Sequence, residues 1–349
     1  MSTTTTTELQ LQSGDVPGAP LLKVRDLNVV FHTRDGDAKA INGVDLDLAE
    51  GETLAILGES GSGKSVTAQA IMGILDMPPA EITSGTVHFR GQELLQLPER
   101  ERRQFRGQRI AMIFQDALSA LNPVYTVGFQ IGEMFTVHRG MSRKDAKAKA
   151  VELMERVRIP GARSRVNDYP HQFSGGMRQR IMIATAIALE PDILIADEPT
   201  TALDVTVQAQ IMDLLADLRR ESGSGLILIT HDLGVVAEVA DRINVMYAGR
   251  VVEQGVAMET FVKPAHPYTH GLLDSIPRLD ASEKRLFAIK GLPPNLLRIP
   301  PGCPYSPRCP RAQEICRHDP PPPEIEVAPG HLSACHFAEE VYADGRAAH

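Results

Sequence analysis

The sequence predicts an α/β protein whose strands form a mostly parallel sheet. Predominantly apolar segments of strand length occur at 53–57, 110–114 and 193–196, which is typical of strands buried on both faces. Segments with helical periodicity, including 64–75 and 205–221, alternate with them. Because parallel strands need crossover connections, this alternation favours a parallel sheet covered by helices.

The remaining elements follow from the same patterns. Residues 22–31, 226–230 and 242–247 have strand character. Residues 144–158 have helical periodicity, and Pro160 predicts where that helix ends, since the residue before a proline disfavours helical backbone.

Composition excludes several classes of protein. The chain has 349 residues, 43% of them hydrophobic, with 36 Lys and Arg against 44 Asp and Glu, a net charge of −8. Wholesale disorder is excluded, and so is nucleic-acid binding, which needs clustered positive charge. No apolar run approaches the ~18–20 residues of a membrane span, and the Thr-rich start has no signal-peptide features, so we expect a cytosolic protein.

The ends of the chain differ from its centre. Residues 1–20 are rich in Thr at the start, then polar with Gly and Pro, and are predicted to be disordered. Residues 256–349 are proline-rich, with four prolines in succession at 320–323, which favours an irregular extension over a second α/β domain. The α/β unit is therefore predicted over 21–255.

A glycine-rich loop with the pattern GxxxxGK[ST] lies between a predicted strand and a predicted helix. Its glycines let the backbone direct successive N–H groups at phosphate oxygens, and the helix adds the positive end of its dipole. Lys64 would reach the β and γ phosphates, and the Ser65 hydroxyl would bind Mg²⁺. The predicted nucleotide-binding residues are Gly58, Ser60, Gly61, Ser62, Gly63, Lys64, Ser65 and Val66.

Two carboxylates follow the apolar strand at 193–196. Asp197 is placed to hold the magnesium ion, directly or through water. Glu198 is the candidate base that orients and deprotonates an attacking water.

A third motif, Phe-Ser-Gly-Gly-Met-Arg-Gln-Arg at 173–180, opens a predicted helix. It resembles the signature of ABC-type ATPases. The other motifs of that family follow in the expected order: Gln115 resembles the Q-loop glutamine, Ala-Leu-Asp at 202–204 the D-loop, and Thr-His-Asp at 230–232 the switch-histidine loop. The resemblance covers about residues 22–255.

The resemblance implies an ABC-type P-loop NTPase with a RecA-like core, an antiparallel β subdomain and a helical subdomain at about 116–180. It implies that ATP lies between one chain's phosphate loop and the signature of a partner chain. Phe31 would stack on adenine, Gln115 would bind Mg²⁺ with Ser65 and Asp197, and His231 would act with Glu198 in catalysis. The residues implied to face the partner chain are Ser174, Gly175, Gly176 and Gln179, with Asp204 in the D-loop.

The type of ABC protein follows from what the chain contains. Lys64 and Ser174 are only 110 residues apart, so no long coiled coil separates the motifs, as it would in a chromosome-maintenance ATPase. Only one cassette is present, which excludes a two-cassette translation factor, and no membrane span marks an exporter. What remains is an ATPase subunit that powers separate membrane subunits and contacts them through its helical subdomain.

Three further segments resemble oligopeptide and dipeptide import ATPases: Ala-Leu-Ser-Ala-Leu-Asn-Pro at 117–123, His-Pro-Tyr-Thr at 266–269 and Gly-Leu-Pro-Pro at 291–294. The resemblance implies a peripheral protein at the cytoplasmic face of the membrane. Its partners would be a sister ATPase in a heterodimer, two permeases and, through them, an extracytoplasmic peptide-binding protein. The alternatives are an importer for nickel or another small solute, or an ABC ATPase outside transport.

All four cysteines of the chain lie between residues 303 and 335. Such clustering in a reducing compartment favours a metal site over disulfides. The pairs of the CxxC type that zinc ribbons prefer are missing, and the residues alone leave an iron–sulfur cluster, zinc and free thiols open. The resemblance to peptide importers implies a [4Fe–4S] cluster, with structural zinc as the alternative. The predicted ligands are Cys303, Cys309, Cys316 and Cys335.

Overall fold

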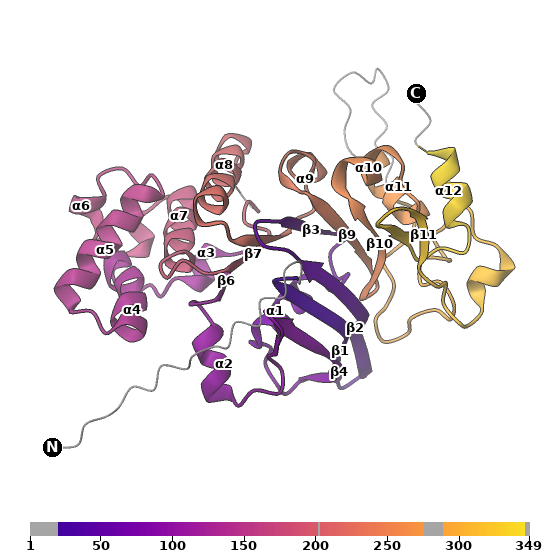
Figure 1. The fold of residues 1–349 in the computed structure, drawn as a ribbon, viewed down its shortest axis with the longest axis horizontal. Helices are drawn as coiled ribbons and strands as arrows, with labels where there is room; N and C mark the ends of the chain where they lie inside the picture. The colour runs from indigo at the N-terminus through magenta and orange to yellow at the C-terminus, as the bar shows by residue number, and fades with distance from the viewer. Residues whose placement is uncertain (1–19, 202, 276–288, 346–349) are drawn as a thin grey trace.

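A computed structural model describes residues 20–201, 203–275 and 289–345. Within these ranges the chain forms an eight-stranded sheet and a four-stranded sheet, with a group of helices at one end (Figure 1). The predicted disorder of residues 1–20 falls almost wholly outside the described residues.

The eight-stranded sheet has the order β11-β12-β10-β9-β3-β8-β7-β6. Its strands from β9 to β6 are parallel, as predicted. Alternate residues of each strand enter different cores, because side chains of a strand point to opposite faces in turn. In β7, Ile193 and Ile195 face one core while Leu194 and Ala196 face the other. The parallel strands are β9 (Arg242–Tyr247), β3 (Thr53–Leu57), β8 (Gly225–Ile229), β7 (Ile193–Asp197) and β6 (Ile110–Ile113).

Helices cover this sheet and begin where its strands end (Figure 1). The helix α1 (Lys64–Met72) follows β3, α8 (Val205–Ser222) follows β7, and α9 (Leu233–Val239) follows β8. In α8 the residues at helical spacing are buried, so one apolar stripe packs on the sheet and the rest faces solvent. Those buried residues are Ile211, Met212, Leu214, Leu215 and Leu218.

The four-stranded sheet is antiparallel and has the order β2-β1-β4-β5. Only its first strand was predicted from the residue pattern; the subdomain itself was implied by the family resemblance. Bulges break the register of β1 with both neighbours, which interrupts the alternation that reveals a strand in the sequence. Its strands are β1 (Leu22–Thr33), β2 (Gly36–Leu48), β4 (Ala80–Phe89) and β5 (Gln92–Glu93), and α2 (Glu99–Phe105) follows.

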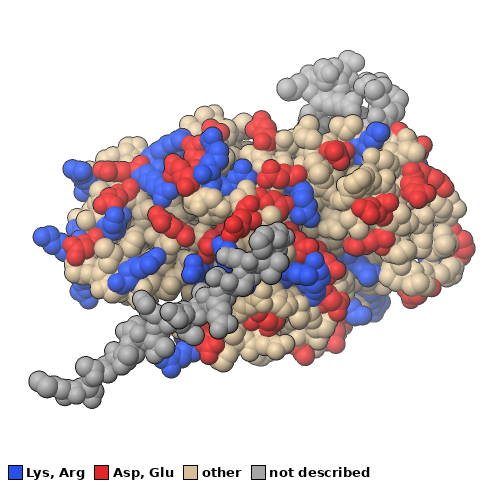
Figure 2. Space-filling model, in the orientation of Figure 1, with Lys and Arg blue, Asp and Glu red and all other residues tan. Residues whose placement is uncertain are grey.

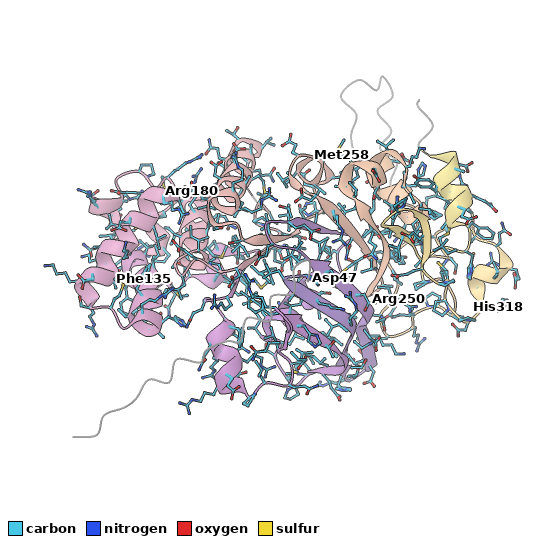
Figure 3. The ribbon with its side chains drawn as sticks, viewed as in Figure 1. Asp47, Phe135, Arg180, Arg250, Met258 and His318 are labelled. Carbon is cyan, nitrogen blue, oxygen red and sulfur yellow. The ribbon has the colours of Figure 1, made fainter. Side chains whose placement is uncertain are left out.

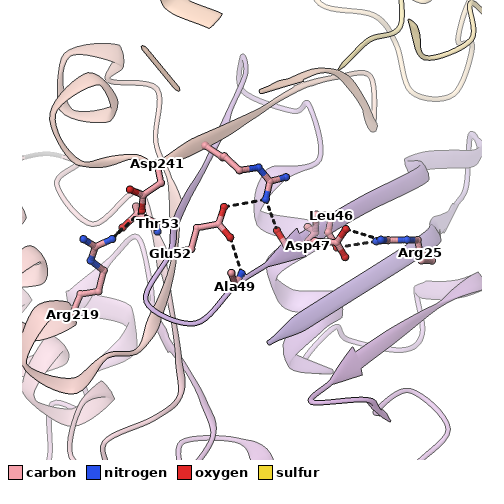
Figure 4. A network of polar contacts seen from close by, with 9 residues as sticks. Arg25, Leu46, Asp47, Ala49, Glu52, Thr53, Arg219 and Asp241 are labelled. Carbon is pink, nitrogen blue, oxygen red and sulfur yellow. Dashed lines mark hydrogen bonds and ion pairs between the residues drawn. The ribbon is translucent and has the colours of Figure 1, made fainter. Parts of the chain in front are cut away.

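A polar network joins the two sheets (Figure 4). Arg25 of β1 pairs with Asp47 of β2 at 2.6 Å. Arg242, at the start of β9, donates to Glu52 at 3.0 Å and to the carbonyl oxygen of Asp47 at 3.5 Å. Because the arginine contacts both sides, it fixes the antiparallel sheet against the edge of the core. The network continues through Arg219, Thr53 and Asp241.

The helices between β6 and β7 form a separate group with its own apolar centre (Figure 1). Phe135 and Arg180 lie in this group, at the opposite end of the molecule from His318 (Figure 3). Side-chain caps at Thr126, Ser142 and Ser174 begin its longer helices. Its helices are α3 (Ala117–Ala120), α4 (Val127–Arg139), α5 (Arg143–Arg156), α6 (Ala162–Arg165) and α7 (Gly175–Ala186).

The C-terminal segment is more regular than its proline content predicts. β12 (His331–Ser333) pairs with β10 (Arg250–Val256), and β11 (Ile325–Ala328) pairs with β12, so the segment adds two strands to the core sheet. Between 289 and 324 the prediction holds better, since the only helical element described there is a 3₁₀ turn, η2 (Glu314–Arg317). The other helices are α10 (Ala257–Val262), α11 (Pro267–Asp274) and α12 (Ala338–Asp344).

The surface mixes both signs of charge, and acidic and basic side chains are interspersed on the face seen in Figure 2. No helix in the described parts of the chain has the length and apolar character needed to cross a bilayer. Several large apolar side chains are nevertheless exposed on or beside the helical group. They include Phe114, Leu118, Val124, Tyr125, Phe129 and Val137.

A buried carboxylate joins the C-terminal segment to the core. Glu253 of β10 accepts hydrogen bonds from the backbone N–H of Ala265 at 2.6 Å and of His266 at 3.0 Å, and it contacts Nε2 of His331 at 2.7 Å. The side chains of Glu253 and His331 are 0% and 1% exposed. Such a group is stable in the interior only because its oxygens are fully partnered.

Glu253→Ala should lower the free energy of unfolding of this region by about 3 kcal/mol, because three buried groups lose their common partner. Denaturant unfolding measures the loss. Glu259→Ala is the matched control, since Glu259 is exposed on α10 and its removal should change stability by less than about 0.5 kcal/mol. Equal losses in the two variants would contradict the role of Glu253.

Candidate functional site

The predicted phosphate loop connects the end of β3 to the start of α1. Two of its glycines are required by the geometry. Gly58 has φ +147°, and a Cβ there would lie 2.3 Å from the carbonyl oxygen of Met246. Gly63 has φ +106°, and its Cβ would lie 2.7 Å from the carbonyl oxygen of Ala40. The loop can therefore pack against its neighbours only with glycine at these positions.

Lys64 is buried at the first turn of α1. Its Nζ donates to the carbonyl oxygens of Gly58 at 2.8 Å and Glu59 at 3.0 Å. Burial lowers the pKa of Lys64, while the negative charges of Glu198, Asp197 and Glu59 act in the opposite direction. The ammonium group is thus held inside the curve of the loop, where the charges of three carboxylates act on it.

Ser65 and Asp197 meet although 132 residues separate them. The Ser65 hydroxyl donates to Oδ1 of Asp197 at 3.0 Å. Burial raises the pKa of Asp197, and the bond from Ser65 works against that shift. A hydroxyl and a carboxylate so placed are the oxygen ligands that Mg²⁺ prefers.

Glu198 is the centre of a cluster of polar groups. Its Oε2 accepts from Nε2 of Gln115 at 2.9 Å and from the Thr201 hydroxyl at 2.8 Å, and it lies 3.6 Å from Nδ1 of His231. Glu198 has φ +44°, in the left-handed region that non-glycine residues rarely adopt. Its N–H donates to the carbonyl oxygen of Ile229, so neighbouring strand β8 holds this backbone in place.

The other predicted nucleotide residues differ in exposure. Phe31 lies near the end of β1, half-buried against the core beside the antiparallel sheet. Ser60 and Gly61 are exposed on the loop, and Val66 is half-buried in α1. Ser62 is buried, and its hydroxyl has no hydrogen-bond partner among the described residues.

The Ser-Gly-Gly motif lies apart from the phosphate loop, at the start of α7, whereas the loop opens α1 (Figure 1). The Ser174 hydroxyl caps α7 by accepting the N–H of Met177, and Ser174 and Gly175 are exposed. A Cβ on Gly176 would lie 2.7 Å from Cγ1 of Val207, so α8 approaches closely here. Gln179 is only 4% exposed, and its side chain is buried in α7.

Asp204, the residue predicted for the D-loop, immediately precedes α8. Its carboxylate accepts the N–H of Val207 at 3.0 Å, which is an ordinary N-terminal cap. The preceding Ala202 lies outside the described residues.

Sequence reasoning missed two residues that contact the phosphate loop. The backbone N–H of Glu59 donates to the Tyr268 hydroxyl at 2.8 Å. The guanidinium of Arg308 makes two hydrogen bonds to the Glu59 carboxylate. Tyr268 stands within the His-Pro-Tyr-Thr segment noted above, but no pattern in the sequence connects it to a loop 209 residues earlier.

The four cysteines line one small cavity together with His336. Burial raises the pKa of Cys303 to about 11 and that of Cys335 to about 12, because desolvation disfavours the thiolate. The number and type of donors fit a cluster, since four thiols converge on one cavity. Yet the described residues include no group of three or more His, Cys, Asp or Glu side chains that could hold a metal ion. The four thiols of the described structure therefore share a cavity but are not arranged as the ligand set of a bound metal.

Two family models match this chain, one in its α/β part and one in its C-terminal segment. A family model described as "ABC transporter" matches residues 41–201, which contain the phosphate loop, the Ser-Gly-Gly motif and both carboxylates. A second, described as "Oligopeptide/dipeptide transporter, C-terminal region", matches residues 252–316.

Solved structures support the same fold. The chain resembles a dimeric ATP-binding cassette in a post-hydrolysis state bound to ADP and Pi, with a TM-score of 0.61, 29% identity, and coverage of 68% of this chain and 98% of that one. The predicted P-loop α/β cassette is therefore confirmed.

Curated relatives match over nearly the whole length. The oligopeptide transport ATP-binding protein OppD of Salmonella typhimurium is 53% identical, over 91% of this chain and 94% of that protein. The dipeptide transport ATP-binding protein DppD of Bacillus subtilis is 53% identical, over 85% of this chain and 88% of that protein. At this identity and coverage, the chain belongs to the family of ATP-binding subunits of oligopeptide and dipeptide ABC transporters.

Proposed function

We propose that this chain hydrolyses ATP to power the import of peptides through separate permease subunits. One observation carries the proposal. The same chain contains a cluster of carboxylates beside a phosphate loop and the C-terminal region that is typical of peptide transporters. That region, and relatives named for oligopeptides and dipeptides, favour peptides over nickel or another small solute as cargo, and favour transport over other ABC functions.

The nucleotide would bind as its magnesium complex. Lys64 and the backbone N–H groups of 58–65 would hold the phosphates, and Ser65, Asp197 and Gln115 would bind Mg²⁺. The hydrogen bond between Ser65 and Asp197 supports this assignment, since it already brings two oxygen ligands together. Phe31 would stack on the adenine.

Glu198 would orient and deprotonate the attacking water. Its oxygen is held by Gln115 and Thr201 and lies close to His231, so the same cluster can connect metal, water and γ-phosphate. Because its backbone and its hydrogen bonds hold this carboxylate in one position, it can accept a proton from a water molecule bound beside it.

The site would be completed by a second ATPase chain. Ser174 and Gly175 are exposed at a helix start apart from the phosphate loop, which supports a role toward a nucleotide held by a partner. A cassette of similar fold is dimeric with ADP and Pi bound. The proposed partner is a sister ATPase, so that hydrolysis of the shared ATP removes the charge that joins the two chains.

The exposed apolar side chains near the helical group would contact the permeases and keep the subunit at the cytoplasmic face of the membrane. Tyr125 and Phe129 form a stacked pair with ring centroids 4.8 Å apart, and Phe129 is 46% exposed. Uncovered aromatic side chains of this kind are typical of protein interfaces. A peptide-binding protein outside the cell would act through those permeases.

We also propose, on the family resemblance and on the convergence of the four thiols at one cavity, that the cysteines hold a [4Fe–4S] cluster. Cys303, Cys309, Cys316 and Cys335 would be its ligands, and binding would remove their protons. The cluster would supply a structural cross-link for the C-terminal segment.

Glu198→Gln should bind ATP with an affinity within about twofold of the unchanged chain, while hydrolysis falls by about 10²–10⁴-fold, because the amide cannot accept the proton. Calorimetric ATP titration and phosphate release measure the two effects, and light scattering should show an ATP-bound dimer with the sister subunit. Glu238→Gln, on the exposed face of α9, is the control. Normal turnover in Glu198→Gln would remove Glu198 from the role.

Phe129→Asp should abolish co-purification with the permease subunits, because a charge would enter an apolar contact. Affinity purification from native membranes, followed by mass spectrometry, measures the retained subunits. The control is Met258→Asp, which places the same charge at a methionine that is 58% exposed and lies far from the helical group (Figure 3). Permease binding by both variants would argue against this docking surface.

The chain purified without oxygen should be brown, absorb near the blue–violet edge of the spectrum, and contain iron and acid-labile sulfide in equal amounts. Cys316→Ser should lose both, because a hydroxyl is a poor ligand for cluster iron. A colourless protein with stoichiometric zinc would favour the zinc alternative, and one without either metal would reject both.

A further inference from the structure

A contact between the C-terminal segment and the phosphate loop stands out from the rest of the molecule. Glu59 is the second residue of the GxxxxGK[ST] loop, and its carboxylate is held by Arg308. Nη1 of Arg308 lies 2.5 Å from Oε2 and Nη2 lies 2.9 Å from Oε1. The Arg308 side chain is only 5% exposed and that of Glu59 is 25% exposed, so this bidentate pair is buried on the arginine side and partly open to water on the carboxylate side.

Aromatic side chains enclose the pair. Arg308 lies over the ring of Tyr247, 5.8 Å from its centroid, and contacts its hydroxyl at 3.4 Å. Tyr268 packs against Tyr247 and accepts the N–H of Glu59. The carboxylate and the backbone N–H of this loop residue are therefore both fixed by later parts of the chain, 249 and 209 residues away.

The charge of Glu59 is unfavourable for phosphate binding. A triphosphate carries several negative charges, and a carboxylate on the loop that holds it would repel them. Glu59 is near enough to act on Lys64, whose ammonium faces the same loop. An arginine that binds the carboxylate with two hydrogen bonds cancels this repulsion and also prevents the side chain from turning toward the nucleotide.

We propose that Arg308 is a positioning residue for ATP binding: it neutralises Glu59 and fixes the phosphate loop, so that the C-terminal segment sets the affinity for ATP. The proposal rests on the proposed role of residues 58–65 as the phosphate site. It assigns to the C-terminal segment a task that is separate from the proposed role of its cysteines.

Arg308 also has a structural role that the test must separate. It donates to the carbonyl oxygens of Lys290 and Ile289, and these bonds hold the C-terminal segment together. If Arg308 acted only there, its loss would lower stability and weaken ATP binding in a way that no change at Glu59 repairs. If it acts by neutralising Glu59, removing the carboxylate should repair the loss.

The test measures the ATP dissociation constant of the full-length chain by calorimetry with Mg²⁺, in a Glu198→Gln background that prevents hydrolysis. Arg308→Ala should raise the constant by about tenfold, as expected for one uncompensated charge near the phosphates. Adding Glu59→Gln to Arg308→Ala should return it to within about threefold of the starting value. Arg308→Lys keeps the charge but not the bidentate geometry, so its ATP dissociation constant should lie between that of the chain with Arg308 and that of Arg308→Ala.

Arg311→Ala is the control for loss of an arginine ion pair elsewhere in the same segment. Arg311 lies three residues later and pairs with Asp344 at 2.6 Å, within the C-terminal segment and away from the loop. Its loss should change the constant by less than about twofold. In the assembled transporter with Glu198 restored, Arg308→Ala should raise the KM for ATP and leave kcat nearly unchanged, because it affects binding before the chemical step.

Two results would overturn the inference: equal ATP binding in Arg308→Ala and Arg311→Ala, or failure of Glu59→Gln to repair Arg308→Ala. Lys64→Ala separates this failure from failure of the proposed function. Lost ATP binding in Lys64→Ala, with no effect of Arg308→Ala, rejects only the role of Arg308. Normal ATP binding in Lys64→Ala rejects the loop as the phosphate site. If Arg308→Ala does not fold, Arg308→Lys with and without Glu59→Gln makes the same comparison.

Discussion

The structure depends on how negative charge is balanced at one edge of the parallel sheet. Asp197 and Glu198 stand at the end of β7, and Glu59 stands on the loop after β3. Parallel strands direct these ends to the same edge, where the helix α1 begins. A polyphosphate adds further negative charge, so the site works only if cations, metal and backbone N–H groups offset it. Lys64, enclosed by the loop, contributes from within.

The same constraint explains why the C-terminal segment packs where it does. Glu253 binds the backbone N–H groups of residues 265 and 266 and so holds this part of the chain against β10. Tyr268 then lies in hydrogen-bond contact with the phosphate loop. Tyr247, Tyr268 and Tyr305 then form one aromatic cluster. Because the cluster excludes water around Arg308, the arginine interacts with Glu59 more strongly than an exposed pair would. The segment is thus part of the environment of the nucleotide loop.

The features that could be predicted from the sequence are those that depend on neighbouring residues in the chain. The parallel strands β3 and β7 are mostly apolar, and the loop needs glycine at positions 58 and 63, so both were visible in the residues. The two added strands were not, because β11 and β12 are short and gain their hydrogen bonds only from β10. The buried Gln179 shows the same limit: its place in a motif gave no information on which face of α7 it occupies.

The pairing of Arg308 with Glu59 was beyond the sequence for a related reason. An isolated arginine in a proline-rich segment has no periodicity, and its partner lies 249 residues away. What a sequence does show is that a glutamate stands inside a phosphate-binding loop, where a negative charge is unfavourable. Read as a charge that must be compensated, Glu59 predicts that some cation lies against it, although only the fold identifies which. Unfavourable charges within a binding motif are therefore useful starting points for finding the residues that support it.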